Sequence, residues 1–194
     1  MNLHRQQYEH MDLDDFEELL ADKPADERWE LIGGRVVRMM VGARWEHNLI
    51  TGNVSSALLR GLRAKRSECR PFAQTFWLKH PQLRLAVCPD IMVRRGRLPP
   101  GATSLDNPVV LMEVVSKGSA QRDRWEKWAL YQRLPSLQHY VLIKRGAMAV
   151  DVFDRVEGGF FKRPRLDQPQ DLLTLPAIDF ALPLAEIHQD VIGV

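Results

Sequence analysis

VVLMEVV, at residues 109–115, is an apolar run that holds one ionisable side chain, Glu113. Short runs rich in Val and Leu are typical of strands buried on both faces of a sheet. An ionised carboxylate in such surroundings is costly, so Glu113 must be protonated, paired with a cation, hydrogen-bonded or bound to a metal. The run therefore predicts a central strand whose single acid has a partner.

A second acid lies in similar surroundings earlier in the chain. Residues 85–93, LAVCPDIMV, embed Asp90 in apolar, β-prone sequence. The next strand expected along the chain is the one with Glu113, so we expect the two acids on neighbouring strands. Two carboxylates placed in this way indicate a metal site.

Length and composition favour one domain spanning residues 1–194, because 194 residues with 45% apolar side chains can bury a single core. Lys and Arg number 27 against 25 Asp and Glu, a balance that by itself indicates no partner. Basic residues do cluster locally, and we interpret each cluster first as a solvated face and second as a phosphate contact. The clusters are Arg60, Arg63, Lys65 and Arg66; Arg94, Arg95 and Arg97; and Lys162, Arg163 and Arg165.

The cysteine content and the N-terminal sequence bear on the compartment. Cys69 and Cys88 have neither zinc-site spacing nor a disulfide framework, so we expect reduced, partly buried thiols. The N-terminal residues are polar, and no apolar run approaches the roughly 18 residues needed to span a membrane. These features predict a soluble, cytoplasmic protein without a membrane partner.

Periodicity and turn signals predict an α/β order of elements. Adjacent glycines at Gly33 and Gly34 indicate a tight β-hairpin turn. From about residue 45 the order is helix, three strands, helix, strand, followed by a C-terminal β extension. The expected elements are a helix at 12–20, hairpin strands at 29–32 and 36–40, a helix at about 45–65, strands at 72–78, 84–93 and 109–115, a loop at 94–108, a helix at 120–133, strands at 140–143 and 149–153, a turn into 160–161, a strand near 172–175 and a helical turn at 184–188.

This αβββαβ order resembles the core of the restriction-endonuclease-like, or PD-(D/E)XK, superfamily. Over residues 11–187 the chain resembles the Uma-type endonuclease family more closely. The resemblance implies a core at about 45–144 with a central mixed sheet, an N-terminal helix and hairpin, and a C-terminal β extension. The matching stretches are Asp12-Leu13-Asp14-Asp15-Phe16, Trp29-Glu30-Leu31-Ile32-Gly33-Gly34, His47, Pro89-Asp90-Ile91, Glu113-Val114-Val115-Ser116, and Asp123 with Lys127 and Tyr131.

The resemblance also implies a reaction and a set of site residues. A nuclease must neutralise the charge of a phosphodiester and generate hydroxide near neutral pH, and Mg²⁺ does both. Asp90, Glu113 and the backbone carbonyl of Val114 would hold Mg²⁺, with Mn²⁺ as a substitute, and Lys127 would hold or activate the attacking water. Glu30 and His47 would lie at the rim of the site or just behind the metal ligands. DNA is the expected substrate, a homodimer is expected from related folds that cut two strands, and no small-molecule cofactor is implied.

The chain departs from the family pattern at a few positions. Val115 stands where the superfamily often has a lysine, and Lys127 on the following helix occupies the place that the Uma-type family uses instead. Gly33 and Arg35 stand where acids are common in the family. These departures affect the hairpin more than the expected metal ligands.

Each expected site residue also has a structural interpretation. Asp90 could cap a turn, and Glu113 could be a buried partner of Lys127 or Arg122 that needs no metal. Lys127 could form a helix-surface salt bridge with Asp123, four residues earlier. His47 could be a hydrogen-bonded structural histidine, and Glu30 a solvated side chain. Lys117 is a further candidate for a phosphate contact.

Two broad functions remain after other chemistries are set aside. The sequence has no phosphate-binding glycine loop, no Gly-x-Ser-x-Gly elbow and no His-Glu-x-x-His zinc motif. The first function is a Mg²⁺-dependent endodeoxyribonuclease. The second is a nucleic-acid-binding or assembly protein that keeps the nuclease fold without turnover and is stabilised by an ion pair between Glu113 and Lys127.

Overall fold

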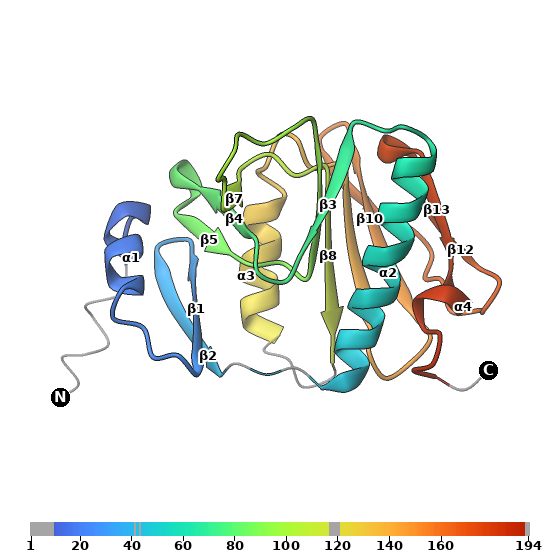
Figure 1. The fold of residues 1–194 in the computed structure, drawn as a ribbon, viewed down its shortest axis with the longest axis horizontal. Helices are drawn as coiled ribbons and strands as arrows, with labels where there is room; N and C mark the ends of the chain where they lie inside the picture. Colours follow the sequence, from blue (N-terminus) through green and yellow to red (C-terminus); the bar gives the residue numbers. More distant parts are fainter. Residues whose placement is uncertain (1–9, 41, 43, 117–120, 193–194) are drawn as a thin grey trace.

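The computed structural model describes residues 10–40, 42, 44–116 and 121–192 and has a mixed α/β architecture (Figure 1). The strands form a six-stranded sheet, a five-stranded sheet and a small two-stranded hairpin. The elements are α1 (Leu13–Leu20), β1 (Glu27–Ile32), β2 (Arg35–Met40), α2 (Trp45–Ala64), β3 (Cys69–Ala73), β4 (Trp77–His80), η1 (Pro81–Leu83), β5 (Leu85–Val87), β6 (Ile91–Arg95), β7 (Ser104–Leu105), β8 (Val110–Val115), α3 (Gln121–Tyr131), β9 (His139–Lys144), β10 (Val150–Val156), β11 (Gly159–Lys162), β12 (Leu172–Leu175), η2 (Pro176–Ile178), β13 (Phe180–Pro183) and α4 (Leu184–Ile187).

The central sheet has the strand order β11-β10-β9-β8-β6-β3. Adjacent strands of this sheet are antiparallel, except β8 and β9, which are parallel. A parallel pair needs a crossover connection, and α3 provides it between β8 and β9. Along the chain, α2, β3, β6, β8, α3 and β9 follow the expected αβββαβ order, with β4 and β5 inserted after β3 and β7 inserted after β6.

The expectation of a single strand over residues 84–93 is wrong. The segment divides at Cys88-Pro89-Asp90 into β5, which pairs with β1 and β4, and β6, which pairs with β3 and β8. Proline has no N–H to donate to a ladder, so the chain leaves one sheet and enters the other at this point.

The expected strand over residues 72–78 is also wrong as one element. It divides into the end of β3 and the start of β4, at a turn where Gln74 has a positive φ of 53°. As a result, the N-terminal hairpin joins β4, β5 and β7 in a second, five-stranded sheet with the order β2-β1-β5-β4-β7. The structure therefore has mixed sheets where the sequence predicted one central sheet.

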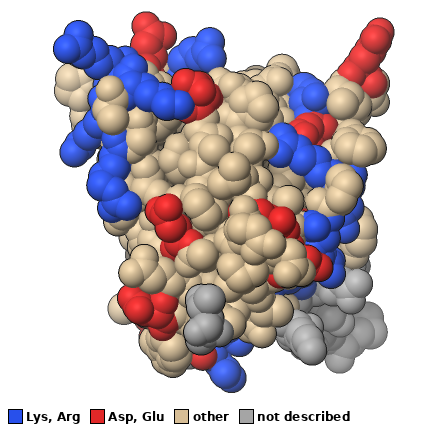
Figure 2. Space-filling model, turned by 90° about the vertical axis from the view of Figure 1, so that its right-hand side faces the viewer, with Lys and Arg blue, Asp and Glu red and all other residues tan. Residues whose placement is uncertain are grey.

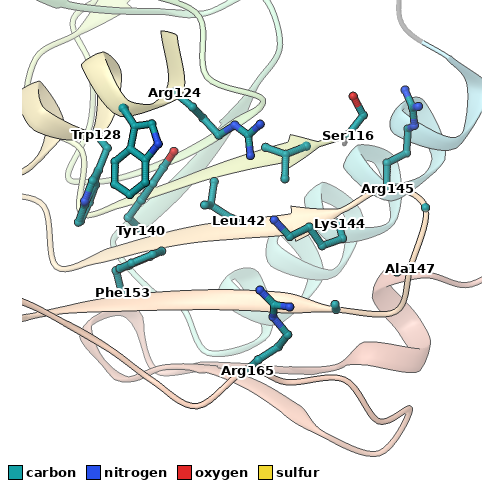
Figure 3. A pocket seen from close by; sticks show the side chains of 14 residues that line it. Ser116, Arg124, Trp128, Tyr140, Leu142, Lys144, Arg145, Ala147, Phe153 and Arg165 are labelled. Atoms are coloured by element: carbon teal, nitrogen blue, oxygen red, sulfur yellow. The ribbon is translucent and has the colours of Figure 1, made fainter. Parts of the chain in front are cut away.

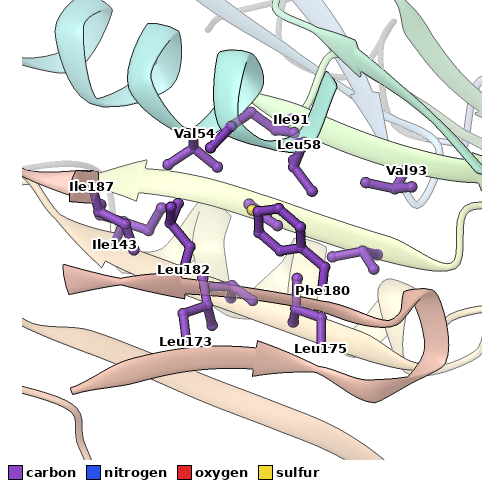
Figure 4. Packing of buried hydrophobic residues seen from close by; sticks show 14 of the residues in the cluster. Val54, Leu58, Ile91, Val93, Ile143, Leu173, Leu175, Phe180, Leu182 and Ile187 are labelled. Atoms are coloured by element: carbon purple, nitrogen blue, oxygen red, sulfur yellow. The ribbon is translucent and has the colours of Figure 1, made fainter. Parts of the chain in front are cut away.

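The two long helices cover opposite faces of β8, as the alternation of side chains along a strand requires. Val54 and Leu58 of α2 belong to a cluster with Met112, on one face. Tyr131 of α3 belongs to a second cluster with Leu111, on the other. The β12-β13 hairpin closes the first cluster with Leu173, Leu175, Phe180 and Leu182 (Figure 4). Glu113 alternates with Met112, so its side chain belongs to the α3 face.

The hairpin prediction is confirmed and has a consequence for the site. Gly33 and Gly34 have φ values of 60° and 88°, a pair of positive values that a two-residue hairpin turn uses. Directly after the turn, the guanidinium of Arg35 pairs with Glu126 of α3. The departure at Arg35 therefore ties the hairpin to the helix that carries Lys127.

Several basic residues of the sequence clusters are paired in the structure. Lys65 contacts Asp179 at 2.8 Å, and Lys162 contacts Asp151 at 3.1 Å. Arg163 binds Asp154. Figure 2 shows basic side chains at the upper left and along the right edge of one face, with uncharged and acidic groups between them. These pairs favour structural roles for part of the basic clusters.

Two expectations about composition can be compared with the structure directly. Cys69 and Cys88 are free thiols and are buried rather than partly buried, and burial raises the pKa of Cys88 to about 11. Among the helices in the described part of the chain, none combines the length and the apolar character that a membrane span requires.

His139 fastens the central sheet to η2, and this contact predicts a pH dependence of stability. Its Nε2 accepts a hydrogen bond from the Ala177 N–H at 3.2 Å, so its Nδ1 carries the hydrogen and donates to Asp154 at 2.7 Å. This is the neutral ring, and burial, opposed by Asp154, lowers the pKa of His139 below 6.5.

Below pH 6.5 His139 is protonated more readily in the unfolded chain than in the folded protein. The free energy of unfolding therefore decreases as the pH is lowered. We expect the melting temperature to fall more between pH 7.5 and 5.5 in the wild type than in His139→Gln. Equal decreases in differential scanning calorimetry would contradict this assignment.

Candidate active site

Asp90 lies at the point where the chain crosses from one sheet to the other. The last pair between β6 and β8 is Ile91 with Met112, so residues 113–115 of β8 extend past the start of β6. Asp90 occupies this end, and its Oδ2 accepts a hydrogen bond of 2.7 Å from the Val114 N–H. The N–H and C=O of one strand residue point to the same side. The Val114 carbonyl therefore faces the Asp90 side of β8.

Lys127 connects the expected catalytic strand to the hairpin. Its Nζ lies 2.7 Å from Oε2 of Glu30 on β1 and 3.8 Å from Oε1 of Glu113 on β8. The lysine side chain is only 14% exposed. Lys127 is therefore not on the helix surface, and the partners that the structure describes for it are acids of other elements.

Glu30 is fully buried, which contradicts both a place at the rim and a solvated side chain. Its Oε1 accepts hydrogen bonds of 3.1 Å from the Cys88 N–H and from Arg28. Arg28 also donates to the Cys88 carbonyl. Residues 29–32 of β1 are all buried, because β1 lies between β2 and β5 in its sheet and α3 packs against it. Glu30 is thus an interior anion held by two cations and an amide.

His47, in the first turn of α2, reaches the same centre. Its Nε2 lies 3.0 Å from Oδ1 of Asp90. The hydrogen bond to Asp90 raises the pKa of His47, although burial and nearby Arg145 oppose the shift. Both oxygens of Asp90 are therefore engaged, one by His47 and the other by Val114.

Burial and charge shift the pKa values of the central groups in different directions. Burial, together with Asp90 and Glu30, raises the pKa of Glu113 to about 7, while Lys127 opposes the shift. Glu30 has a lowered pKa, because Lys127 and Arg28 outweigh its burial. Lys127 has a raised pKa, because Glu30 and Glu113 outweigh its burial. At neutral pH Lys127 is therefore a cation and cannot accept a proton, whereas Glu113 lies close to its titration point.

Two residues of this centre were missed as site residues in the sequence. Tyr131 donates a hydrogen bond of 3.2 Å to Oε1 of Glu113, and Arg28 binds Glu30. Spacing could have indicated both, because Tyr131 is one helical turn after Lys127 and Arg28 is on the same strand face as Glu30. Lys117 and the side chains of Arg122 and Asp123 lie outside the described residues.

The oxygen atoms at this site are the type of ligand that a hard divalent cation prefers, although the protein supplies too few of them to surround the ion. Among the described residues, no three His, Cys, Asp or Glu side chains are grouped to enclose a metal by themselves. Mg²⁺ does not need such a cage, since it usually keeps several waters and binds one or two carboxylates plus substrate phosphate. Asp90, Glu113 and the Val114 carbonyl supply oxygens only. Burial first, and the negative charge of Asp90 and Glu30 second, raise the pKa of Glu113, and a bound cation would favour its ionised form.

Comparisons with known proteins agree with this architecture. The chain is 28% identical over 145 residues to the uncharacterized protein sll1609 of Synechocystis sp., which covers 72% of this chain and 79% of that protein. The crystal structure of a "putative nuclease belonging to DUF820" from Anabaena variabilis superposes with a TM-score of 0.73 at 18% identity. That match covers 94% of this chain and 99% of the other and shows a shared fold. The model of the Uma2 family, described as "Putative restriction endonuclease", matches residues 13–185, which include every residue of the candidate site. The chain therefore belongs to the Uma2 family.

Proposed function

We propose that this protein is a Mg²⁺-dependent endonuclease that hydrolyses phosphodiester bonds in DNA. Asp90, Glu113 and the Val114 carbonyl would hold the metal, with Mn²⁺ as a substitute. When bound, the metal would supply charge neutralisation at the phosphate and a water of lowered pKa. Family membership and the oxygen donor set support this proposal.

The observation that carries the proposal is the convergence of three chain segments on residues 113 and 114 of β8. Asp90 reaches β8 through the Val114 N–H at 2.7 Å, and Lys127 reaches Glu113 at 3.8 Å. These residues come from the start of β6, from β8 and from α3, and a buried structural pair would need only two of them. The pairing of an acid with raised pKa and a permanently charged lysine suits a site that binds cation and phosphate together.

Lys127, His47 and Tyr131 would have different roles in the reaction. Lys127, held as a cation by Glu30, would orient water and stabilise charge on the phosphoryl oxygens. His47 would position Asp90, and Tyr131 would fix the carboxylate plane of Glu113. Because Lys127 stays protonated, it would act by its charge and its hydrogen bonds.

The proposal is tested by metal binding and cleavage in Asp90→Asn. We expect saturable Mg²⁺ binding in calorimetric titration for the wild type and a loss of about tenfold or more in Asp90→Asn, because the variant loses a charged oxygen ligand. Supercoiled plasmid should be cut with Mg²⁺ or Mn²⁺ and not with chelator. Asp26→Asn, an exposed acid between α1 and β1, is the matched control.

The alternative is a binding or assembly protein without turnover, stabilised without a metal by the ion pair between Glu113 and Lys127, whose charged atoms lie 3.8 Å apart. Absence of metal binding by the wild type, together with uncut plasmid and uncut single-stranded DNA, would favour this alternative. A homodimer able to cut two strands is a further part of the proposal. Its test is the molar mass in light scattering.

A further inference from the structure

Arg124, Trp125 and Trp128 of α3 line a recess that does not include Lys127. It is a cavity of about 710 Å³ between α3, the ends of β8 and β9, and β10 (Figure 3). This volume is within the range of small-molecule and cofactor sites. Its lining begins at Val115 and Ser116, only two and three residues after Glu113, so the recess opens beside the candidate active site.

The rim of this recess is basic. Arg124, Lys144, Arg145 and Arg165 line it, and no acidic residue is among its lining residues in the described part of the chain. The nearby Asp151 balances only part of this charge, because Lys144, Lys162 and Arg165 all lie within 3.6 Å of its carboxylate. Arg145 is close enough to His47 to oppose the protonation of that histidine. The positive rim therefore continues toward the candidate metal ligands.

The interior of the recess is aromatic. Tyr140 and Trp128 stack with their ring centroids 4.8 Å apart, and Phe153 lies beside them at 5.0 Å from Trp128. Trp125 also lines the recess, and 63% of it is exposed, an unusual state for so large an apolar side chain. The recess thus offers an open aromatic surface above a packed aromatic base.

The hydroxyl of Tyr140 adds a polar group that lacks a partner. Tyr140 is 1% exposed, and its buried hydroxyl has no hydrogen-bond partner among the described residues. In Figure 3 this oxygen points toward the α3 side of the recess, where Arg124 lies. A buried hydroxyl without a partner costs free energy, and a ligand with a donor or acceptor would remove that cost.

We propose that this recess receives one unpaired nucleotide of the substrate strand. The base would stack on Trp125 and bond the Tyr140 hydroxyl, and its phosphates would lie against Arg145 and Lys144. Aromatic surfaces bordered by basic side chains are the common means of holding single-stranded nucleic acid. The inference rests on the proposed nuclease function and adds a substrate preference, namely DNA with single-stranded or extruded nucleotides over continuous duplex.

The experiment measures binding without cleavage. All proteins carry Glu113→Gln and are studied with chelator, and fluorescence anisotropy follows a labelled 12-nucleotide single strand and the same sequence as a duplex. We expect tighter binding of the single strand and a loss of about 5- to 100-fold in Trp125→Ala, the range expected for one stacked base. Arg145→Glu should also weaken binding. The matched controls are Phe161→Ala, an exposed aromatic outside the recess, and Arg63→Glu, at the far end of α2; thermal unfolding verifies that each variant is folded.

The possible results separate this inference from the nuclease proposal. Unchanged single-strand binding in both Trp125→Ala and Arg145→Glu would overturn the recess assignment, whether or not the wild type cuts plasmid. If binding depends on Trp125 but the wild type never cuts DNA, nucleotide binding in the recess would be supported and the nuclease proposal would be contradicted. Free deoxyadenosine monophosphate bound as tightly as the strand would also overturn the assignment, because it would indicate a small-molecule site.

Discussion

Glu113→Gln is expected to lower metal-dependent cleavage by about 10³-fold or more while making the metal-free protein more stable at alkaline pH. The loss of activity follows from the removal of a charged metal ligand at the centre of the site, an effect at least as large as the loss of one preorganised electrostatic group. Glutamine keeps the shape of the side chain and can still accept the hydrogen bond from Tyr131. The change therefore removes charge with little change in packing.

The gain in stability follows from the pKa of Glu113, which burial raises from 4.5 to about 7. The folded protein binds this proton more tightly than the unfolded chain does, so wild-type stability falls as pH rises from 4.5 to about 7. The ionised form then costs on the order of 3 kcal/mol, and glutamine avoids that cost. Substitutions that relieve an unfavourable interaction in an active site commonly increase stability and decrease activity.

Urea unfolding with chelator at pH 5 and pH 8 measures the effect. The stability of Glu113→Gln relative to wild type should increase between the two values, and adding Mg²⁺ at pH 8 should stabilise only the wild type. A variant that is less stable than wild type at pH 8 would mean that the ionised Glu113 is a favourable partner of Lys127. That result would favour the binding or assembly protein over the enzyme.

The sequence predicted most elements because their local signals agreed with their tertiary surroundings. The glycine pair at residues 33 and 34 gave the hairpin, and the apolar face of residues 45–64 gave α2. The strand boundaries near Pro89 were harder to predict, since apolar sequence continues through the break. Only the pairing partners show that β5 and β6 belong to different sheets.

Some residues of the candidate site could likewise be predicted from the sequence, and others could not. Asp90 and Glu113 could be found in the sequence because an acid in an apolar strand needs a partner. The burial of Glu30 could not be predicted, because one face of a hairpin is usually solvated and the covering helix α3 comes about 90 residues later. The contacts of Lys127 depend on this long-range packing as well. Tertiary structure thus determines which acid holds the lysine.

Glu30→Ala is expected to lower the free energy of unfolding by about 3–5 kcal/mol, the range for breaking a buried ion pair. Glu30 is fully buried, and its removal leaves Arg28 and Lys127 without their common anion and the Cys88 N–H without its acceptor. A cavity adds to the cost. The exposed pair of Glu17 and Lys79 has the same 2.7 Å separation, so Glu17→Ala, expected to cost no more than about 1 kcal/mol, is the matched control.

A double-mutant cycle with Lys127→Met tests whether the charge of the lysine causes this loss. If it does, the double variant should be more stable than the sum of the two single changes predicts, by about 0.5–3 kcal/mol, because it no longer contains a buried ammonium that has lost its nearer anion. Additive losses would show that Glu30 acts through its other bonds, to Arg28 and Cys88. In that case Glu30 would not be what keeps Lys127 positively charged beside Glu113, and the proposed stabilisation of phosphate by Lys127 would lose its structural basis.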